Sequence, residues 1–171
     1  LHKLALTDEL TQLANRRSFV ESVEAELARH QSDNDSATMV IMDLDKFKVI
    51  NDSYGHNGGD EVLRHVAKLL KDTLRQYDIV GRIGGEEFAI FLGTTNQDTA
   101  LCIAERLRET IASSPLIFNN QEITVASSFG MAVHVGKSNF EELYACADEA
   151  LYRAKHNGRN RVEVFECNKI D

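Results

Sequence analysis

Two groups of carboxylates in the sequence could hold a metal ion. In the first, Glu86 and Glu87 follow a Gly-Gly pair between the apolar runs 77–80 and 88–92, a pattern that predicts a strand, a tight turn and a strand. A Gly-Gly pair tolerates positive φ at both central positions, which suits a two-residue hairpin turn. Strands disfavour Glu, and adjacent like charges repel. A bound cation would explain the pair, although a solvated acidic turn is the simpler interpretation of this motif alone.

The second group, Asp43 and Asp45, follows a short apolar run that predicts a buried strand over 38–42. By themselves these residues could cap the next helix. Alternatively, Asp43 forms a carboxylate pair with one glutamate of the hairpin, since Mg²⁺ is typically held by one or two carboxylates plus substrate phosphate oxygens. Side chains alternate along a strand, so Glu86 and Glu87 should point to opposite faces and only one should share a metal with Asp43. The spacing does not say which.

Asn51 and Asp60 flank a glycine-rich loop predicted over 54–59. A carboxylate can accept the adjacent N–H donors of a guanine edge, and an asparagine can meet its O6 or N7. Such a polar pocket rejects the wrong base because its buried groups would be left unpaired. The simpler interpretation of Asp60 is a carboxylate in the first turn of a helix, where the helix dipole favours it. His56 in the loop is weak evidence by itself.

Several basic residues stand where they could meet phosphates. Lys155 and Arg159 bracket a predicted helix end and by default complement its dipole, but together with Lys48 they could neutralise a triphosphate. Arg75 and Asp78 lie just before the hairpin, and a surface ion pair is their simplest interpretation.

The elements that must position these residues do not alternate regularly. Helical periodicity and apolar runs predict helices over 16–31, 46–53, 60–74, 99–113 and 140–156, and strands over 38–42, 77–80, 88–92, 116–118, 123–126, 131–135 and 161–165. Helices and hairpins mixed around roughly five strands predict an α+β fold whose central, mostly antiparallel sheet is flanked by helices. The pattern disfavours a Rossmann-like fold.

Composition restricts the possible partners. The 171 residues carry a net charge of −8, which argues against indiscriminate binding to nucleic acid or to an anionic membrane surface. Cys102, Cys146 and Cys167 form no CxxC pair, and the first two fall in helical apolar patterns, which predicts core residues in a reducing, cytoplasmic compartment. No apolar stretch approaches 18 residues, and there is no signal-peptide pattern. The chain begins with Leu, and residues 1–6 resemble the end of a helix, which predicts a fragment of a longer protein.

Four motifs occur in register along nearly the whole chain. They are Asp8-x-Leu-Thr-x-Leu-x-Asn-Arg-Arg17, Asp43-Leu-Asp-x-Phe-Lys-x-Ile-Asn-Asp-x-Tyr-Gly-His-x-x-Gly-Asp60, Arg82-x-Gly-Gly-Glu-Glu-Phe88 and Ala147-Asp-x-Ala-Leu-Tyr-x-Ala-Lys-x-x-Gly-Arg-Asn160. This pattern resembles the GGDEF-domain diguanylate cyclases from about Asp8 to Phe165. The resemblance implies a palm-like α+β domain, similar to the catalytic core of adenylyl cyclases, over residues 8–167. Residues 1–7 would then end an upstream linker helix, and 168–171 would be a tail.

The resemblance also implies a reaction. Two GTP molecules would condense to cyclic di-GMP with release of two pyrophosphates, and Mg²⁺ is the expected cofactor, with Mn²⁺ as an alternative. Each domain would bind one GTP, so catalysis would need a homodimer. The alternative is a catalytically impaired GGDEF module that senses cyclic di-GMP or GTP.

Site residues follow from matching positions in this family. The metal ligands would be Asp43, Glu86 and the backbone carbonyl of Leu44; GTP would be bound by Phe47, Lys48, Asn51, His56, Asp60, Lys155 and Arg159, with Asn51 and Asp60 at the guanine and the three basic residues at the phosphates. Glu86 would accept the proton, with Glu87 or a metal-bound water as alternatives because a metal-bound carboxylate is a poor base. Arg75 and Asp78 match the RxxD site at which cyclic di-GMP inhibits, with Arg106 as a secondary contact.

Overall fold

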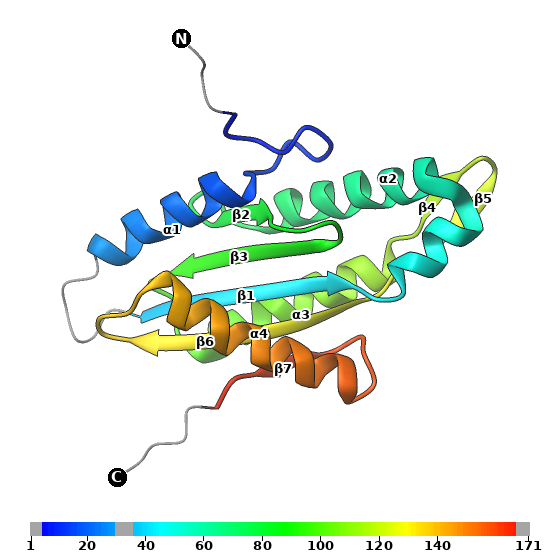
Figure 1. Ribbon diagram of the computed structural model, residues 1–171. Coiled ribbons are helices and arrows are strands. Elements are labelled where there is room, and N and C mark those ends of the chain that lie inside the picture. Colours follow the sequence, from blue (N-terminus) through cyan, green and yellow to red (C-terminus); the bar gives the residue numbers. More distant parts are fainter. Residues whose placement is uncertain (1–4, 30–35, 167–171) are drawn as a thin grey trace.

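A five-stranded sheet organises the computed structural model, which describes residues 5–29 and 36–166 (Figure 1). Its strand order is β2-β3-β1-β6-β7, and every neighbouring pair is antiparallel except β6 and β7. The strands are β1 (Ser36–Leu44), β2 (Ile79–Arg82), β3 (Glu87–Gly93), β6 (Ser127–Val135) and β7 (Val162–Val164); the helices are α1 (Arg16–Arg29), α2 (Phe47–Thr73), α3 (Gln97–Ser113) and α4 (Phe140–His156); and β4 (Leu116–Phe118) pairs separately with β5 (Gln121–Ile123). The predicted α+β class with a mostly antiparallel sheet is confirmed.

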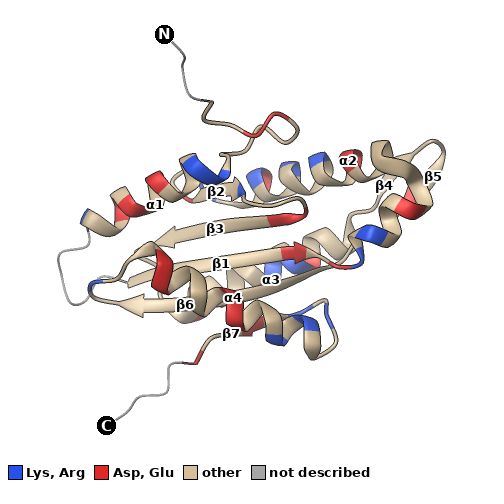
Figure 2. Ribbon diagram, viewed as in Figure 1, with Lys and Arg blue, Asp and Glu red and all other residues tan. Residues whose placement is uncertain are grey.

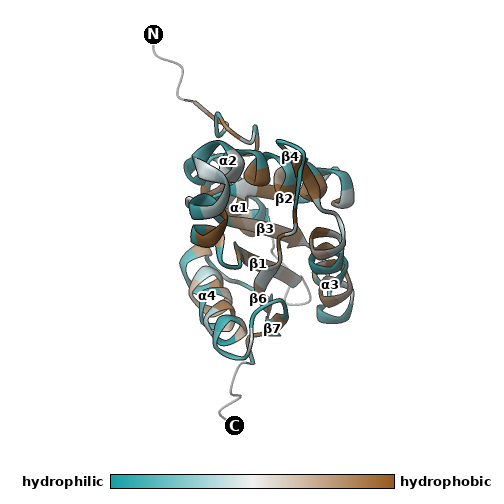
Figure 3. Cartoon of the chain, turned by 90° about the vertical axis from the view of Figure 1, so that its right-hand side faces the viewer, coloured by the Kyte–Doolittle hydropathy of each residue, from teal (hydrophilic) through white to brown (hydrophobic). Residues whose placement is uncertain are grey.

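Both faces of the sheet are covered by helices. On central strand β1, Val40 and Met42 pack with residues of α2 and α3, whereas Met39 and Ile41 pack with residues of α1 and α4. Burial on both faces explains why this strand is an uninterrupted apolar run rather than an alternating one. Figure 3 shows α3 and α4 on opposite sides of the sheet. Among the described residues, no helix has both the length and the apolar character needed to cross a bilayer.

The predicted loop over 54–59 is a kink within one long helix. Helix α2 runs from Phe47 to Thr73, and only Gly55 departs from helical geometry inside it, with φ 75° and ψ 172°. Glycine has no Cβ to clash at positive φ, so it can bend the chain here at little steric cost. The two predicted helices are therefore present, but the loop between them is reduced to this kink.

The Gly-Gly turn also differs from its prediction. Strand β2 ends at Arg82 and β3 begins at Glu87, so residues 83–86 form the turn and neither Gly84 nor Gly85 has positive φ. A two-residue turn does join β4 and β5, as predicted for this second hairpin, and there Asn119 and Asn120 have φ of 49° and 62°. Positive φ at both central residues is the signature of a type I′ turn.

Strand β6 is longer than predicted because residues 127–130, expected as a connection, belong to it. A Cβ added to Gly130 would overlap the backbone of α4 at Ala147 and Leu151. The helix therefore lies directly on this strand, and the missing side chain permits the approach.

The remaining differences are local. Cys102 is exposed on α3 rather than a core residue, and Cys146 is half-buried. Residues 5 and 6 are not helical, in contrast to the helix predicted over 1–6. Residues 1–4, residues 30–35 between the helix predicted over 16–31 and the strand predicted over 38–42, Cys167 and the tail 168–171 lie outside the described residues.

Candidate active site

A pocket of about 210 Å³ lies at the end of the sheet where β1 ends, α2 begins and α4 ends. Its lining consists of Asp43, Leu44, Asp45, Lys46, Phe47, Lys48, Glu86, Lys155 and Arg159. Figure 2 shows the acidic end of β1 and the acidic start of β3 on the same side of the sheet as the basic start of α2 and the basic end of α4. This lining includes every residue for which the sequence predicted metal or phosphate contact.

Asp43 and Lys155 form the ion pair at the base of this pocket. Asp43 is only 9% exposed at the end of β1, and Lys155 Nζ donates to its Oδ2 over 2.7 Å from the last turn of α4. A buried carboxylate needs such a partner, because desolvation without compensation is costly. Lys155 thus holds positive charge beside the carboxylate where a metal and phosphates were predicted.

Glu86 shares the pocket with Asp43. Burial raises the pKa of the Glu86 carboxyl, the nearby Asp43 raises it further, and Lys155 opposes both effects. Two carboxylates that repel each other in a partly dry pocket favour a bound cation. Together with the Leu44 backbone carbonyl they offer oxygen ligands, which Mg²⁺ prefers. The described residues contain no cluster of three or more acidic, histidine or cysteine side chains suited to a metal, so substrate oxygens would have to complete the set.

Glu87 has different surroundings from Glu86. Tyr144 on α4 donates its hydroxyl to Glu87 Oε1 over 2.8 Å. Burial raises the pKa of the Glu87 carboxyl, and the bond from Tyr144 lowers it in part. The two glutamates have different hydrogen-bond partners, but the predicted reason, alternation along a strand, does not apply, because Glu86 lies in the turn before β3.

Arg82 holds the turn that carries Glu86. Its Nε and Nη2 donate to the Gly85 carbonyl over 3.1 and 2.8 Å, and its Nη1 donates to both carboxylate oxygens of Asp8 over 3.1 and 3.2 Å. Burial raises the pKa of Asp8, but hydrogen bonds from Thr11 and Arg82 outweigh it and leave that pKa lowered. The Arg82 backbone N–H also donates to the Ala14 carbonyl over 2.9 Å. The segment 7–15 is thereby bonded to the turn.

Asp45 connects its own segment to two others beside the pocket through hydrogen bonds. Its carboxylate accepts from Ser128 Oγ on β6 over 2.6 Å and from the Asn160 backbone N–H over 2.9 Å. Arg159 and Asn160 both have positive φ, at 63° and 45°, so they form a sharp bend after α4. Asp45 stabilises this bend and so fixes the backbone from which Arg159 reaches the pocket.

The predicted guanine-binding residues lie along α2 on either side of its kink. A Cβ on Gly59 would overlap the Asn51 side-chain oxygen, so the Asn51 amide lies against Gly59 and next to Asp60. Within the described part of the chain, neither Asn51 nor Asp60 has a side-chain hydrogen-bond partner, so both are available to a ligand. His56 is exposed one residue after the kink at Gly55.

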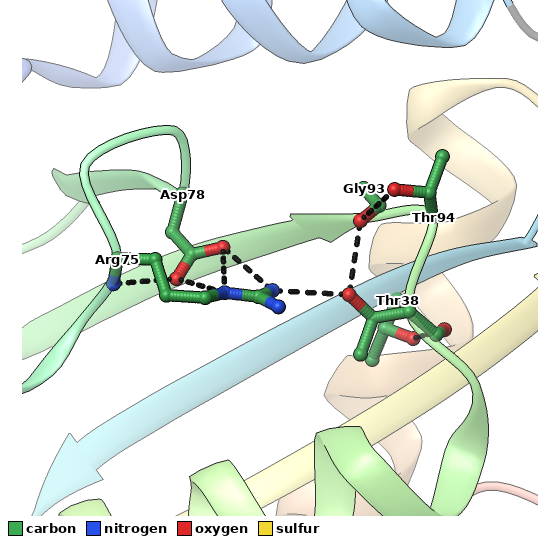
Figure 4. A network of polar contacts seen from close by, with 6 residues as sticks. Thr38, Arg75, Asp78, Gly93 and Thr94 are labelled. Atoms are coloured by element: carbon green, nitrogen blue, oxygen red, sulfur yellow. Dashed lines mark hydrogen bonds and ion pairs between the residues drawn. The ribbon is translucent and has the colours of Figure 1, made fainter.

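Arg75 and Asp78 are more than a surface ion pair. The Asp78 side chain is 0% exposed and accepts from the backbone N–H, Nε and Nη2 of Arg75 (Figure 4). Arg75 Nη2 also donates to Thr95 Oγ1 over 3.0 Å, and its guanidinium lies 4.6 Å from the centroid of the Tyr77 ring. Arg106 is exposed on α3, and among the described residues no hydrogen bond or ion pair joins it to this turn. The structure thus brings Arg75 and Asp78 together without Arg106.

Residues 5–161 match the family described as diguanylate cyclase, GGDEF domain. The chain belongs to this family. Its matching residues include the pocket, the kinked helix and the Arg75–Asp78 turn.

Named relatives share this GGDEF domain within longer proteins. The chain is 42% identical over 160 residues to the diguanylate cyclase DgcP of Pseudomonas aeruginosa, covering 94% of this chain and 24% of that protein. It is 39% identical over 165 residues to a diguanylate cyclase of Vibrio cholerae, covering 96% of this chain and 51% of that protein. The chain therefore spans about a quarter of the length of the first relative and about half of the length of the second. The GGDEF domain of Caulobacter crescentus DgcB, solved in complex with c-di-GMP, superimposes with a TM-score of 0.91 at 30% identity, covering 98% of this chain and 99% of that one.

Sequence reasoning missed several residues that build the site of this GGDEF domain. Asp8 and Arg82 stand in the matched motifs, but nothing local pairs residues 74 positions apart. Asp45 was interpreted only as a possible cap. Tyr144 gave no signal, because one tyrosine on an amphipathic helix is indistinguishable from a packing residue until its hydroxyl partner is known.

Proposed function

We propose that this GGDEF domain condenses two GTP molecules into cyclic di-GMP and two pyrophosphates. The observation that carries the proposal is the convergence of Asp43, Glu86 and Lys155 in one pocket at the end of the sheet. The names of the relatives, diguanylate cyclases that match 94% or more of this chain, support the same activity.

Positioning and charge neutralisation are the main requirements of phosphoryl transfer. Lys48, Lys155 and Arg159 line the pocket and supply positive charge for the triphosphate. A divalent cation held by Asp43, Glu86 and the Leu44 carbonyl would neutralise phosphate oxygens and lower the pKa of the attacking 3′-hydroxyl. Glu86 is the better placed proton acceptor of the two glutamates, since Glu87 is bonded to Tyr144.

In this proposal, Asn51 and Asp60 recognise the guanine base and distinguish it from other bases. Their side chains, which have no hydrogen-bond partner among the described residues, can meet the O6 or N7 acceptors and the adjacent N–H donors of the base. Phe47 packs beside Gly59, where its ring supports this segment of α2, and exposed His56 can reach the ribose or base. A base without matching donors leaves the Asp60 carboxylate unpaired and is rejected for that reason.

A homodimer is part of the proposal. One pocket with one guanine-binding pair accommodates one GTP, so two domains must face each other to join two molecules in a ring. Product formation should then rise more steeply than linearly with protein concentration.

Incubation of the purified domain with GTP and Mg²⁺, followed by chromatography of the nucleotides, tests this function. We expect cyclic di-GMP and pyrophosphate from GTP and no cyclic product from ATP. Omission of the divalent cation should abolish the product. Binding of GTP without product at high protein concentration would reject the cyclase and favour the impaired sensor.

We also propose that the product, cyclic di-GMP, binds at Arg75 and Asp78 and inhibits the reaction. Arg75→Ala should remove the bidentate contact to guanine or phosphate and relieve inhibition by added cyclic di-GMP, with initial rates preserved. Because it also leaves buried Asp78 without its guanidinium partner, the free energy of unfolding should fall by about 1–3 kcal/mol. Initial rates at rising cyclic di-GMP and urea denaturation measure the two effects.

Arg75→Lys is the matched variant for this experiment. Lysine keeps a positive charge beside Asp78 but cannot bind bidentately, so inhibition should weaken with a smaller loss of stability. Inhibition that is equal in all three proteins would place the inhibitory site elsewhere.

A further inference from the structure

Sheet geometry places Glu87, rather than Glu86, directly across from Asp43. The two are register partners in the β1–β3 ladder, and the Leu44 N–H donates to the neighbouring Glu86 carbonyl. Asp43 and Glu87 are therefore a non-hydrogen-bonded pair, whose side chains share one face with Cβ atoms roughly 4.5–5.5 Å apart. The next register pair on that face, Ile41 and Ala89, packs in one core cluster. By geometry alone, Glu87 would be the natural partner of Asp43 at a cation.

Tyr144 gives the Glu87 carboxylate another partner. Its hydroxyl donates to Glu87 Oε1 over 2.8 Å, and its ring packs on Phe140 with 5.5 Å between centroids. The Arg16 guanidinium lies 5.7 Å from the same ring centroid. Burial and the bond to Glu87 raise the pKa of Tyr144 to about 12, so the hydroxyl remains a donor at neutral pH. The Tyr144 ring is thus contacted by Arg16 from α1 and by Phe140 from α4.

Tyr144 bonds Glu87 from a position on α4 well before the end of the helix that lines the pocket. Lys155, which bonds Asp43 in the pocket, follows Tyr144 by eleven residues. That spacing is roughly 16 Å along the helix axis. Glu87 thus bonds to α4 about three turns before Lys155. It is absent from the pocket lining whereas Glu86 is part of it, although Asp43 and Lys155 are close enough to affect its pKa.

We propose that Tyr144 is a positioning residue that keeps Glu87 out of the cation pocket, so that Asp43 and Glu86 alone supply its carboxylates. The inference rests on the metal-binding role in the proposed function. Affinity for a hard divalent cation rises with the number of charged oxygen ligands. With two carboxylates and Lys155 opposing, the pocket should bind a bare cation weakly and depend on nucleotide phosphates for tight binding. A third carboxylate would create a site that fills without nucleotide.

Binding of Mn²⁺ in the absence of nucleotide tests this inference directly. Electron paramagnetic resonance of free Mn²⁺ should give a dissociation constant about five- to tenfold lower for Tyr144→Phe than for the unaltered domain, because ligand charge governs affinity. Tyr144→Met, which also removes the hydroxyl, should show the same gain. Adding Glu87→Gln to either variant should abolish the gain, since an amide supplies no charge.

Tyr152→Phe is the matched control on the same helix. Tyr152 is 61% exposed and stacks on His156, so loss of its hydroxyl should leave Mn²⁺ affinity unchanged. A purely structural role of Tyr144 would lower the melting temperature without tightening Mn²⁺ binding, and that result, or a gain that survives Glu87→Gln, would overturn the inference. The measurement needs no turnover: absence of cyclic di-GMP from the unaltered domain would reject the proposed function, whereas Mn²⁺ affinity alone decides the role of Tyr144.

Discussion

Glu86→Gln should reduce cyclic di-GMP formation by at least about 10²–10³-fold, the usual cost of losing one preorganised electrostatic group at a reacting centre. The substitution keeps the size of the side chain and its place in the turn but removes the charge that faces Asp43. Asp43→Asn should cause a comparable loss, with the added effect that Lys155 loses its charged partner. Initial rates at saturating GTP and Mg²⁺ measure both.

The melting temperature distinguishes the loss of a charged group in the pocket from unfolding of the domain. In the native domain, Glu86 is half-buried beside a like charge that raises its pKa, so its neutral replacement should not lower the melting temperature. Glu122→Gln, at an exposed position on β5, is the control and should retain full activity. Activity within tenfold of the unaltered domain in a folded Glu86→Gln variant would exclude Glu86 from both metal binding and proton transfer.

Gly130→Ala should cause the largest loss of stability. Its Cβ would overlap the Ala147 carbonyl and the Leu151 backbone N–H and lie 2.7 Å from the Leu151 Cα. These are backbone atoms of α4, which cannot rotate away as a side chain can, so the whole helix must move off the sheet. Overpacking in a well-packed core costs about 1–3 kcal/mol and occasionally more, and we expect the upper end or beyond. Urea denaturation monitored by circular dichroism gives the value.

The same displacement should also reduce activity. Lys155 sits on the last turn of α4, so movement of the helix lengthens its 2.7 Å contact with Asp43. Gly93→Ala at the end of β3 is the matched control, because its Cβ would meet only the Phe91 ring at 3.5 Å, an ordinary contact. Equal stability of the Gly130 and Gly93 variants would mean that α4 packs less closely on β6 than the geometry indicates.

The α+β class and most elements could be predicted from the sequence because local patterns encode them. The helix predicted over 140–156 matches α4, since its apolar period and the Asn139 cap are both local. The predicted ends of elements were wrong where tertiary contacts decide the structure. Polar Ser127 and Ser128 made residues 127–130 look like a connection, but both side chains are fully buried in β6. A kink at Gly55 takes the place of the predicted loop because Gly58 and Gly59 are buried and already belong to the second helical segment of α2.

The pocket residues were predicted from motif positions, and the structure brings them together. What no local pattern could supply were bonds across the fold. The bond between Tyr144 and Glu87 joins residues 57 positions apart, and the bond between Arg82 and Asp8 joins residues 74 positions apart. Such pairs are set by the packing of helices on the sheet, a long-range property that spacing along the chain does not contain.

The pairing of Ala14 with β2 has a consequence beyond the pocket. Strand β2 is the outermost strand on its side of the sheet, and edge strands expose backbone groups that can pair with another chain. Ala14 forms a parallel bridge with Gly81, and a Cβ on Gly81 would lie 3.0 Å from the Ala14 carbonyl. The segment that bonds to Arg82 before the Gly-Gly turn thus also covers part of a sheet edge that could otherwise pair with another chain, so the same few residues contact both the turn and the edge.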